Sequence, residues 1–236
     1  MAIESSVRVT AARPATPPRA TPAPTDGRGW IVPGAEELFR SLYTGFELAA
    51  GTSIAICSAV SGEGKTTISL GLASAIAHDL ADRRVVVVET DLWRPVLAAD
   101  FGIDPSPGLV DCLLDRQPLS TALRTTALDN LSLLVAGGPV ASPQRLLRSA
   151  RMPELVATLR RTHDVVILDT PAALAHSEVG LLSRMVEEVV VVVRTGITPQ
   201  ADLAKALARL PGNIRGIIVN DARSSVPTSI RQLMRL

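Results

Sequence analysis

The sequence predicts an α/β fold in which helices cover both faces of a mainly parallel sheet. Six short aliphatic runs are typical of strands, and helical stretches separate several of them. Each run is apolar at consecutive positions, as in strands that a parallel sheet buries on both faces. Because only 3% of the residues are aromatic, the core must be aliphatic. The predicted strands are residues 53–57, 85–88, 131–135, 165–168, 189–193 and 214–219.

The chain begins with a segment rich in proline, alanine and threonine that lacks apolar periodicity. We expect residues 1–34 to form a disordered arm, and a flexible tether fits them better than a proline-rich docking motif. Residues 35–236 are long enough for a single well-buried domain. Its first helix is predicted over residues 36–49, with Gly51 ending it, and further helices over residues 66–78, 153–161 and 200–210.

Composition and charge exclude several classes of protein. A net charge of +1 does not indicate a nucleic-acid surface, so no nucleic-acid partner is expected. Two cysteines are too few for a disulfide scaffold, and three scattered histidines have no zinc-ligand spacing. There is no secretory signal, and the apolar runs are too short to span a bilayer. We therefore expect a cytoplasmic protein, peripheral to the inner face of the membrane only through a partner.

A phosphate-binding motif follows the first predicted strand. Residues 58–67 read Ser-Ala-Val-Ser-Gly-Glu-Gly-Lys-Thr-Thr and precede a helix, which is the Walker A pattern with Ala59 in place of its first glycine. Lys65 supplies charge for the terminal phosphates, and the Thr66 hydroxyl can ligate Mg²⁺. A chance glycine-lysine turn is the alternative, which the strand–loop–helix context disfavours. The pattern predicts a P-loop NTPase that binds ATP and Mg²⁺ through Ser61, Gly62, Glu63, Gly64, Lys65, Thr66 and Thr67.

Acidic residues follow two other predicted strands. Asp169 comes after an aliphatic run in the Walker B pattern, where a carboxylate can hold magnesium. Glu89 and Asp91 follow the second strand and are spaced by one residue, so in an extended chain both would face the magnesium and the γ-phosphate. A strand cap at Asp169 and a surface acidic pair at the second site are the structural alternatives.

At these residues the chain resembles the bacterial tyrosine kinases (BY-kinases) of capsule and exopolysaccharide synthesis. They share a division of P-loop proteins with the Min and Par partitioning ATPases. The resemblance covers residues 36–221 and is most specific in the loop around Lys65. Val60 stands where the partitioning ATPases carry a second lysine, which favours the kinase branch.

The resemblance implies roles for particular residues and partners. Lys65, Glu89 and Asp91 would be catalytic, and Thr66, Asp91 and Asp169 would hold the metal. Asn220 would contact adenine. A membrane-anchored polysaccharide chain-length regulator would be the partner, and homo-oligomerisation stays open.

Several residues depart from the pattern of the family. Glu89 stands in place of an aspartate, Trp93 in place of an arginine, and Arg145 in place of a glutamate. The assembly helix of the family appears as Glu37-x-x-Arg40-x-x-Tyr43 without its last arginine, which argues against a ring. The tyrosine-rich tail is missing and Tyr43 is the only tyrosine, so the acceptor is expected on another protein.

Three functions fit these observations. The first is a BY-kinase-like kinase or ATPase of polysaccharide synthesis or export. The second is a non-phosphorylating module that senses ATP and regulates the export machinery, which the departures around Trp93 keep open. The third is a partitioning ATPase, against which Val60 and the near-neutral charge stand.

Overall fold

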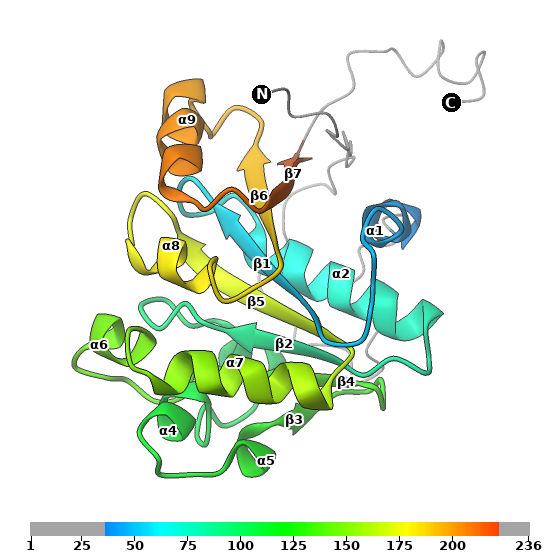
Figure 1. The fold of residues 1–236 in the computed structure, drawn as a ribbon, viewed down its shortest axis with the longest axis vertical. Helices are drawn as coiled ribbons and strands as arrows, with labels where there is room; N and C mark the ends of the chain where they lie inside the picture. The colour runs from blue at the N-terminus through cyan, green and yellow to red at the C-terminus, as the bar shows by residue number, and fades with distance from the viewer. Residues whose placement is uncertain (1–35, 222–236) are drawn as a thin grey trace.

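A computed structural model describes residues 36–221 (Figure 1). The arm predicted over residues 1–34 lies outside them, as does the last part of the domain predicted over residues 35–236. A seven-stranded sheet has the order β3-β4-β2-β5-β1-β6-β7, and only β3 runs antiparallel to its neighbour. The strands are β1 (Thr52–Ser58), β2 (Val85–Glu89), β3 (Arg124–Thr125), β4 (Leu131–Leu134), β5 (Val165–Ala172), β6 (Glu188–Arg194) and β7 (Ile214–Asn220).

Helices cover both faces of this sheet, as the sequence predicts. Successive residues of β1 enter different cores: Ile54 and Ile56 pack toward one face, and Ala55 and Cys57 toward the other. On the first face lie α1 (Glu36–Tyr43), α2 (Lys65–Asp79) and α3 (Leu97–Phe101). On the second lie α4 (Leu109–Leu113), α5 (Leu119–Ala122), α6 (Pro143–Leu147), α7 (Arg151–Thr162), α8 (Glu178–Leu182) and α9 (Gln200–Arg209).

The first helix is shorter than the predicted 36–49. It ends at Tyr43, and turns follow in which the Gly45 and Phe46 N–H groups donate to Leu42 and Tyr43 carbonyls. The Thr52 hydroxyl donates to the carbonyls of residues 47 and 49, which draws this segment toward β1. The prediction that Gly51 ends the helix is therefore wrong. Gly51 has φ +80° in the turn before β1, where an added Cβ would meet the Arg160 carbonyl oxygen at 2.8 Å.

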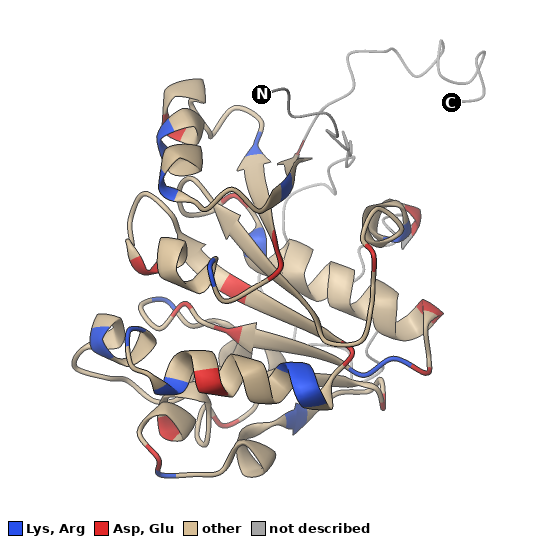
Figure 2. Ribbon diagram, viewed as in Figure 1, with Lys and Arg blue, Asp and Glu red and all other residues tan. Residues whose placement is uncertain are grey.

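The six predicted strands and the other three predicted helices are confirmed, with ends that differ by a few residues. The short β3 and the helices of four or five residues were not predicted, because elements of this length show little periodicity. Figure 2 shows that basic and acidic residues are scattered over many elements in both signs. This distribution agrees with the near-neutral net charge.

Candidate nucleotide and phosphoryl-transfer site

The loop between β1 and α2 turns at two glycines. Gly62 has φ +85° and Gly64 has φ +94°, conformations in the left-handed region that favours glycine. Gly64 directly precedes α2, so the N-terminal N–H groups of that helix lie beside the loop. An added Cβ on Gly64 would lie 2.3 Å from Asn220 Nδ2. The loop therefore has the form of a phosphate cradle at a helix N-terminus.

Glu63 holds this loop from the inside. Its side chain is fully buried, and Oε2 accepts the Val60 N–H at 2.7 Å. Oε1 accepts the hydroxyl of Thr198, which lies in the loop between β6 and α9. The neighbouring Ser61 and Thr67 are exposed. Glu63 thus shapes the loop with its side chain, which leaves its backbone N–H for ligand contact.

Lys65 begins α2 and is 9% exposed. Within residues 36–221, its ammonium group forms no hydrogen bond or ion pair. A buried cation without a partner is costly, so an anion supplied by a ligand would stabilise this arrangement. A buried ammonium group without a bonded partner is expected of a lysine that binds phosphate.

Asp169 lies inside β5, three residues before its end, and beside β1. Its Oδ2 accepts the Thr66 hydroxyl at 2.7 Å, and its Oδ1 accepts the Ser69 hydroxyl at 3.1 Å. Burial raises the pKa of Asp169 to about 7, although the Thr66 hydroxyl, the Lys65 charge and the Ser69 hydroxyl act in the opposite direction. A buried carboxylate beside a hydroxyl, with no cation bonded to it, fits the oxygen ligands that Mg²⁺ prefers.

The two acids of the second motif have different surroundings. Glu89 ends β2 opposite Asp169 in the parallel register and is 1% exposed. Its Oε1 accepts the N–H groups of Val96 at 2.5 Å and Leu97 at 2.8 Å, and its Oε2 accepts the Ala136 N–H at 2.9 Å. Burial raises the pKa of Glu89. Both carboxylate oxygens are engaged with the backbone, which differs from the expectation that this side chain reaches the phosphate.

Asp91 is only partly buried. Its Oδ1 accepts the N–H groups of Trp93 at 3.2 Å and Arg94 at 3.0 Å, which closes a turn. Its Oδ2 has no hydrogen-bond partner in the part of the chain that the structure describes. The structure records no contact between Asp91 and Thr66 or Asp169. Of the two acids, Asp91 is the one with an oxygen available to a ligand.

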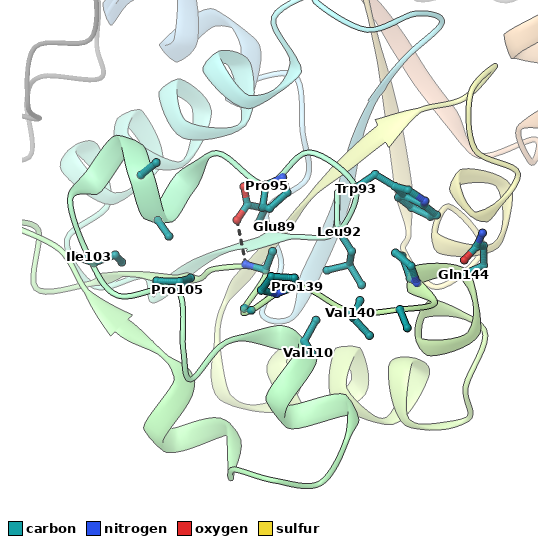
Figure 3. A pocket seen from close by; sticks show the side chains of 17 residues that line it. Glu89, Leu92, Trp93, Pro95, Ile103, Pro105, Val110, Pro139, Val140 and Gln144 are labelled. Atoms are coloured by element: carbon teal, nitrogen blue, oxygen red, sulfur yellow. Dashed lines mark hydrogen bonds between the residues drawn. The ribbon is translucent and has the colours of Figure 1, made fainter.

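A groove of about 790 Å³ is lined by Glu89 and by residues that follow Asp91 in the chain. Figure 3 shows Glu89 with Leu92, Trp93 and Pro95 along one side and Pro139 and Val140 along another, and its dashed line marks the bond from Ala136 to Glu89. The Trp93 ring stacks on His176 with centroids 3.9 Å apart. This stack joins the segment after β2 to the segment after β5, and sequence analysis gave no sign of it.

Polar side chains also meet at the ends of β6 and β7. Asn220 Nδ2 donates to the Glu63 carbonyl at 2.9 Å, so the residue that the resemblance assigns to adenine does lie against the loop. Arg194 pairs with Asp221 and reaches the Gly62 carbonyl at 3.4 Å. Sequence reasoning missed Arg194 and Asp221, although both are charged and lie at the carboxyl ends of parallel strands, where ligands bind.

The glycine loop, the unpaired lysine and the Thr66–Asp169 pair define a P-loop nucleotide-binding domain. A family model described as the CobQ/CobB/MinD/ParA nucleotide binding domain matches residues 54–235. The chain belongs to this family and, within it, to the bacterial tyrosine-protein kinases.

Individual relatives support this assignment. Tyrosine-protein kinase YwqD of Bacillus subtilis is 30% identical over 80% of this chain and 82% of its own length. CpsD of Streptococcus pneumoniae is 28% identical over 81% of this chain and 86% of its own length. The chain spans only 27% of tyrosine-protein kinase ptk of Acinetobacter johnsonii, which is 31% identical over 81% of this chain.

Solved structures show the same fold. The VpsO kinase domain superposes with a TM-score of 0.73 at 28% identity, covering 80% of this chain and 94% of its own. The kinase domain of Escherichia coli ETK has a TM-score of 0.79 at 24% identity, covering 94% and 91% of the two chains. MinD of Pyrococcus horikoshii, solved with Mg-ADP, has a lower TM-score of 0.57 at 26% identity and covers 77% and 76%.

Among residues 36–221, no helix has the length and apolar character needed to cross a bilayer. In the same range, no three His, Cys, Asp or Glu side chains are arranged to hold a metal ion.

Proposed function

We propose that this chain binds ATP with Mg²⁺ and transfers the γ-phosphoryl group to a hydroxyl of a protein in capsule or exopolysaccharide synthesis or export. The observation that carries the proposal is the pairing of Thr66 with a buried Asp169 beside an unpaired Lys65. The three side chains supply a hydroxyl, a carboxylate and a cation, which are the groups that hold a nucleotide triphosphate and its metal.

Each site residue has a distinct part in this proposal. Residues 61–67 hold the phosphates through backbone N–H groups, and Lys65 neutralises charge on the transferred phosphoryl group. Thr66 and Asp169 would hold Mg²⁺ with the support of Asp91; the ion would neutralise phosphate charge. Asp91, which has a free oxygen, would accept a hydrogen bond from the attacking hydroxyl and orient it.

Glu89 has a positioning part rather than a catalytic one. Its three backbone bonds join the start of α3 to Ala136, which follows β4, and both α3 and the segment that begins at Ala136 line the groove. Glu89 thereby fixes the walls on the acceptor side of the site. Its bonds to Val96 and Leu97 also anchor the segment that carries Asp91 and Trp93.

The acceptor lies outside the 236 residues of this chain. Tyr43, the only tyrosine, is 9% exposed, and its hydroxyl donates to Asp79 at 2.8 Å. Burial, followed by the bond to Asp79, raises the pKa of Tyr43, so the phenol is a poor nucleophile where it lies. A tyrosine of a membrane-anchored chain-length regulator is the acceptor we propose, acting at the cytoplasmic face.

Arg40 bears on self-assembly. Its guanidinium bonds to Asp79 at 2.7 Å and to Glu37 at 2.9 Å within the same chain. The remaining charges of the assembly motif are therefore satisfied internally, which argues against a ring built through α1.

The decisive experiment uses labelled ATP, Mg²⁺ and cytoplasmic segments of candidate membrane partners. We expect phosphotyrosine on a partner with the unaltered chain, at least tenfold less with Asp91→Asn, and none with Lys65→Ala. Lys205→Ala is the matched control, since Lys205 is an exposed lysine of α9 paired with Asp202. Label that persists in Lys65→Ala would come from a contaminating kinase and would contradict the proposal.

The second candidate is a regulatory module that binds ATP without phosphorylating a protein. The observation that favours it is Glu89, whose carboxylate is committed to the backbone. This candidate predicts that the chain binds ATP tightly but transfers no phosphate to any partner segment. A partitioning ATPase is disfavoured by Val60, which leaves the loop with one lysine.

A further inference from the structure

Asp221 has a buried carboxylate oxygen that no group within residues 36–221 satisfies. Its Oδ2 accepts two bonds from the Arg194 guanidinium, at 3.2 Å from Nε and 3.0 Å from Nη2. Its Oδ1 is buried and has no hydrogen-bond partner in the part of the chain that the structure describes. Buried acceptors are nearly always bonded, so an unbonded one beside a ligand site indicates a group that the ligand satisfies.

The position of Asp221 is tied to the P-loop by its neighbours. Asn220 donates to the Glu63 carbonyl and packs on Gly64, and its Oδ1 accepts the Asp221 N–H at 2.9 Å. Arg194, opposite Asn220 in the parallel register, reaches the Gly62 carbonyl. The contacts of Asn220 and Arg194 with the loop thus fix the Asp221 carboxylate next to its turn.

The order of the strands shows which part of a nucleotide would lie here. The loop follows β1, and the acids Asp91 and Asp169 follow or lie in β2 and β5, on one side of it. The metal and the acceptor therefore belong on that side. The ends of β6 and β7 border the loop on the other side, so the base of the nucleotide would lie there.

We propose that Asp221, held by Arg194, reads the exocyclic amino group of adenine through Oδ1 and gives the site its preference for ATP over GTP. Adenine presents one amino group at its 6-position, where guanine presents a carbonyl oxygen that a carboxylate repels. The N1–H and amino group of guanine lie side by side and need two acceptors. Only one oxygen of Asp221 is unpaired, since Arg194 occupies the other.

This inference rests on the proposed nucleotide binding, and the test separates the two. Dissociation constants with Mg²⁺ are measured by calorimetry for ATP, GTP and purine riboside triphosphate, which lacks the 6-amino group. We expect the unaltered chain to bind ATP about tenfold or more tighter than purine riboside triphosphate, the size of one hydrogen bond to a charged group. Equal affinities would overturn the inference, whereas failure to bind any of them would overturn nucleotide binding itself.

Two variants locate the effect. Asp221→Ala should bind ATP about tenfold more weakly but leave the affinity for purine riboside triphosphate within about twofold. Asp221→Asn, which keeps the shape, can turn an amide N–H toward the base and should raise the affinity for GTP relative to ATP. Asp202→Ala, at a partly exposed acid of α9 that pairs with Lys205, is the control.

The same pair of ligands distinguishes a contact to the sugar. If Asp221 bonded a ribose hydroxyl, Asp221→Ala would weaken ATP and purine riboside triphosphate equally, and that result would overturn the proposal. An unchanged ratio of ATP to GTP affinity in Asp221→Asn would overturn it as well. The comparison of ligands in the unaltered chain needs no substitution, so it can refute the proposal even if a variant fails to fold.

Discussion

Glu89 offers a sharp test of the site because its catalytic and positioning roles predict opposite results. Glu89→Asp keeps the negative charge but shortens the side chain by one methylene group. The shortened carboxylate cannot bridge the start of α3 and Ala136, which follows β4; Glu89 joins them through three backbone N–H groups. At least one or two buried N–H groups then lose their acceptor.

The cost follows from those lost bonds. Each buried donor left without a partner costs about 1–3 kcal/mol, so we expect Glu89→Asp to lower the free energy of unfolding by about 2–4 kcal/mol. Glu89→Gln should lower the free energy of unfolding by less. It removes a buried charge that burial already disfavours, as the raised pKa of Glu89 indicates, and its remaining oxygen still accepts backbone N–H groups. ATP affinity should stay within about threefold in both variants, since Glu89 does not contact the P-loop.

The measurement is urea unfolding followed by circular dichroism, with Glu154→Asp on the exposed surface of α7 as the control. A catalytic Glu89 would give a different pattern. Glu89→Asp, which restores the usual residue of the family, would then unfold within about 0.5 kcal/mol of the unaltered chain and keep or gain transfer activity. That outcome would refute the positioning role.

Three further predictions test the rest of the site. Asp169→Asn should abolish magnesium-dependent binding. In the ligand-free chain, the raised pKa of Asp169 should lower the free energy of unfolding as pH rises from about 4 to 7, and the variant should lose this pH dependence. A folded pKa of about 7 against 3.8 corresponds to a loss of at most about 4 kcal/mol, which urea unfolding across that pH range would measure. Gly64→Ala, whose Cβ would lie 2.3 Å from Asn220 Nδ2, should weaken ATP binding at least tenfold by calorimetry, and Gly62→Ala, with open space around it, should weaken it less. Tyr43→Phe should cost about 1 kcal/mol in unfolding and leave phosphotyrosine on the partner unchanged in a labelling assay.

The sequence predicts the sheet well because its strands are buried on both faces. In β2, Val85 and Val87 enter one core and Val86 and Val88 the other, so every position must be apolar and the strand is visible as a run. The P-loop is equally visible, since its glycines are required by positive φ angles at fixed spacing. These features depend on local chain geometry, which sequence records directly.

Side-chain orientation at the strand ends is less visible. The spacing of Glu89 and Asp91 suggests two equivalent acids, but β2 ends at Glu89 and the chain then turns. The partners of Glu89 lie at residues 96, 97 and 136, and a contact over such separations leaves no local pattern. The Trp93–His176 stack and the Arg194–Asp221 pair escaped prediction for the same reason.

Two departures from the kinase pattern, Glu89 and Trp93, lie on one side of the P-loop. Glu89, Trp93 and the groove lie at β2 and β4, beyond β5, whereas Lys65, Thr66 and Asp169 lie at β1 and β5 with the arrangement expected for nucleotide and metal. We expect a change on that side to alter which hydroxyl can approach, because residues that follow Asp91 line the groove. Such a change should leave the phosphate contacts of the P-loop unaltered. We therefore expect exchange of the groove residues to change the acceptor before it changes the affinity for ATP.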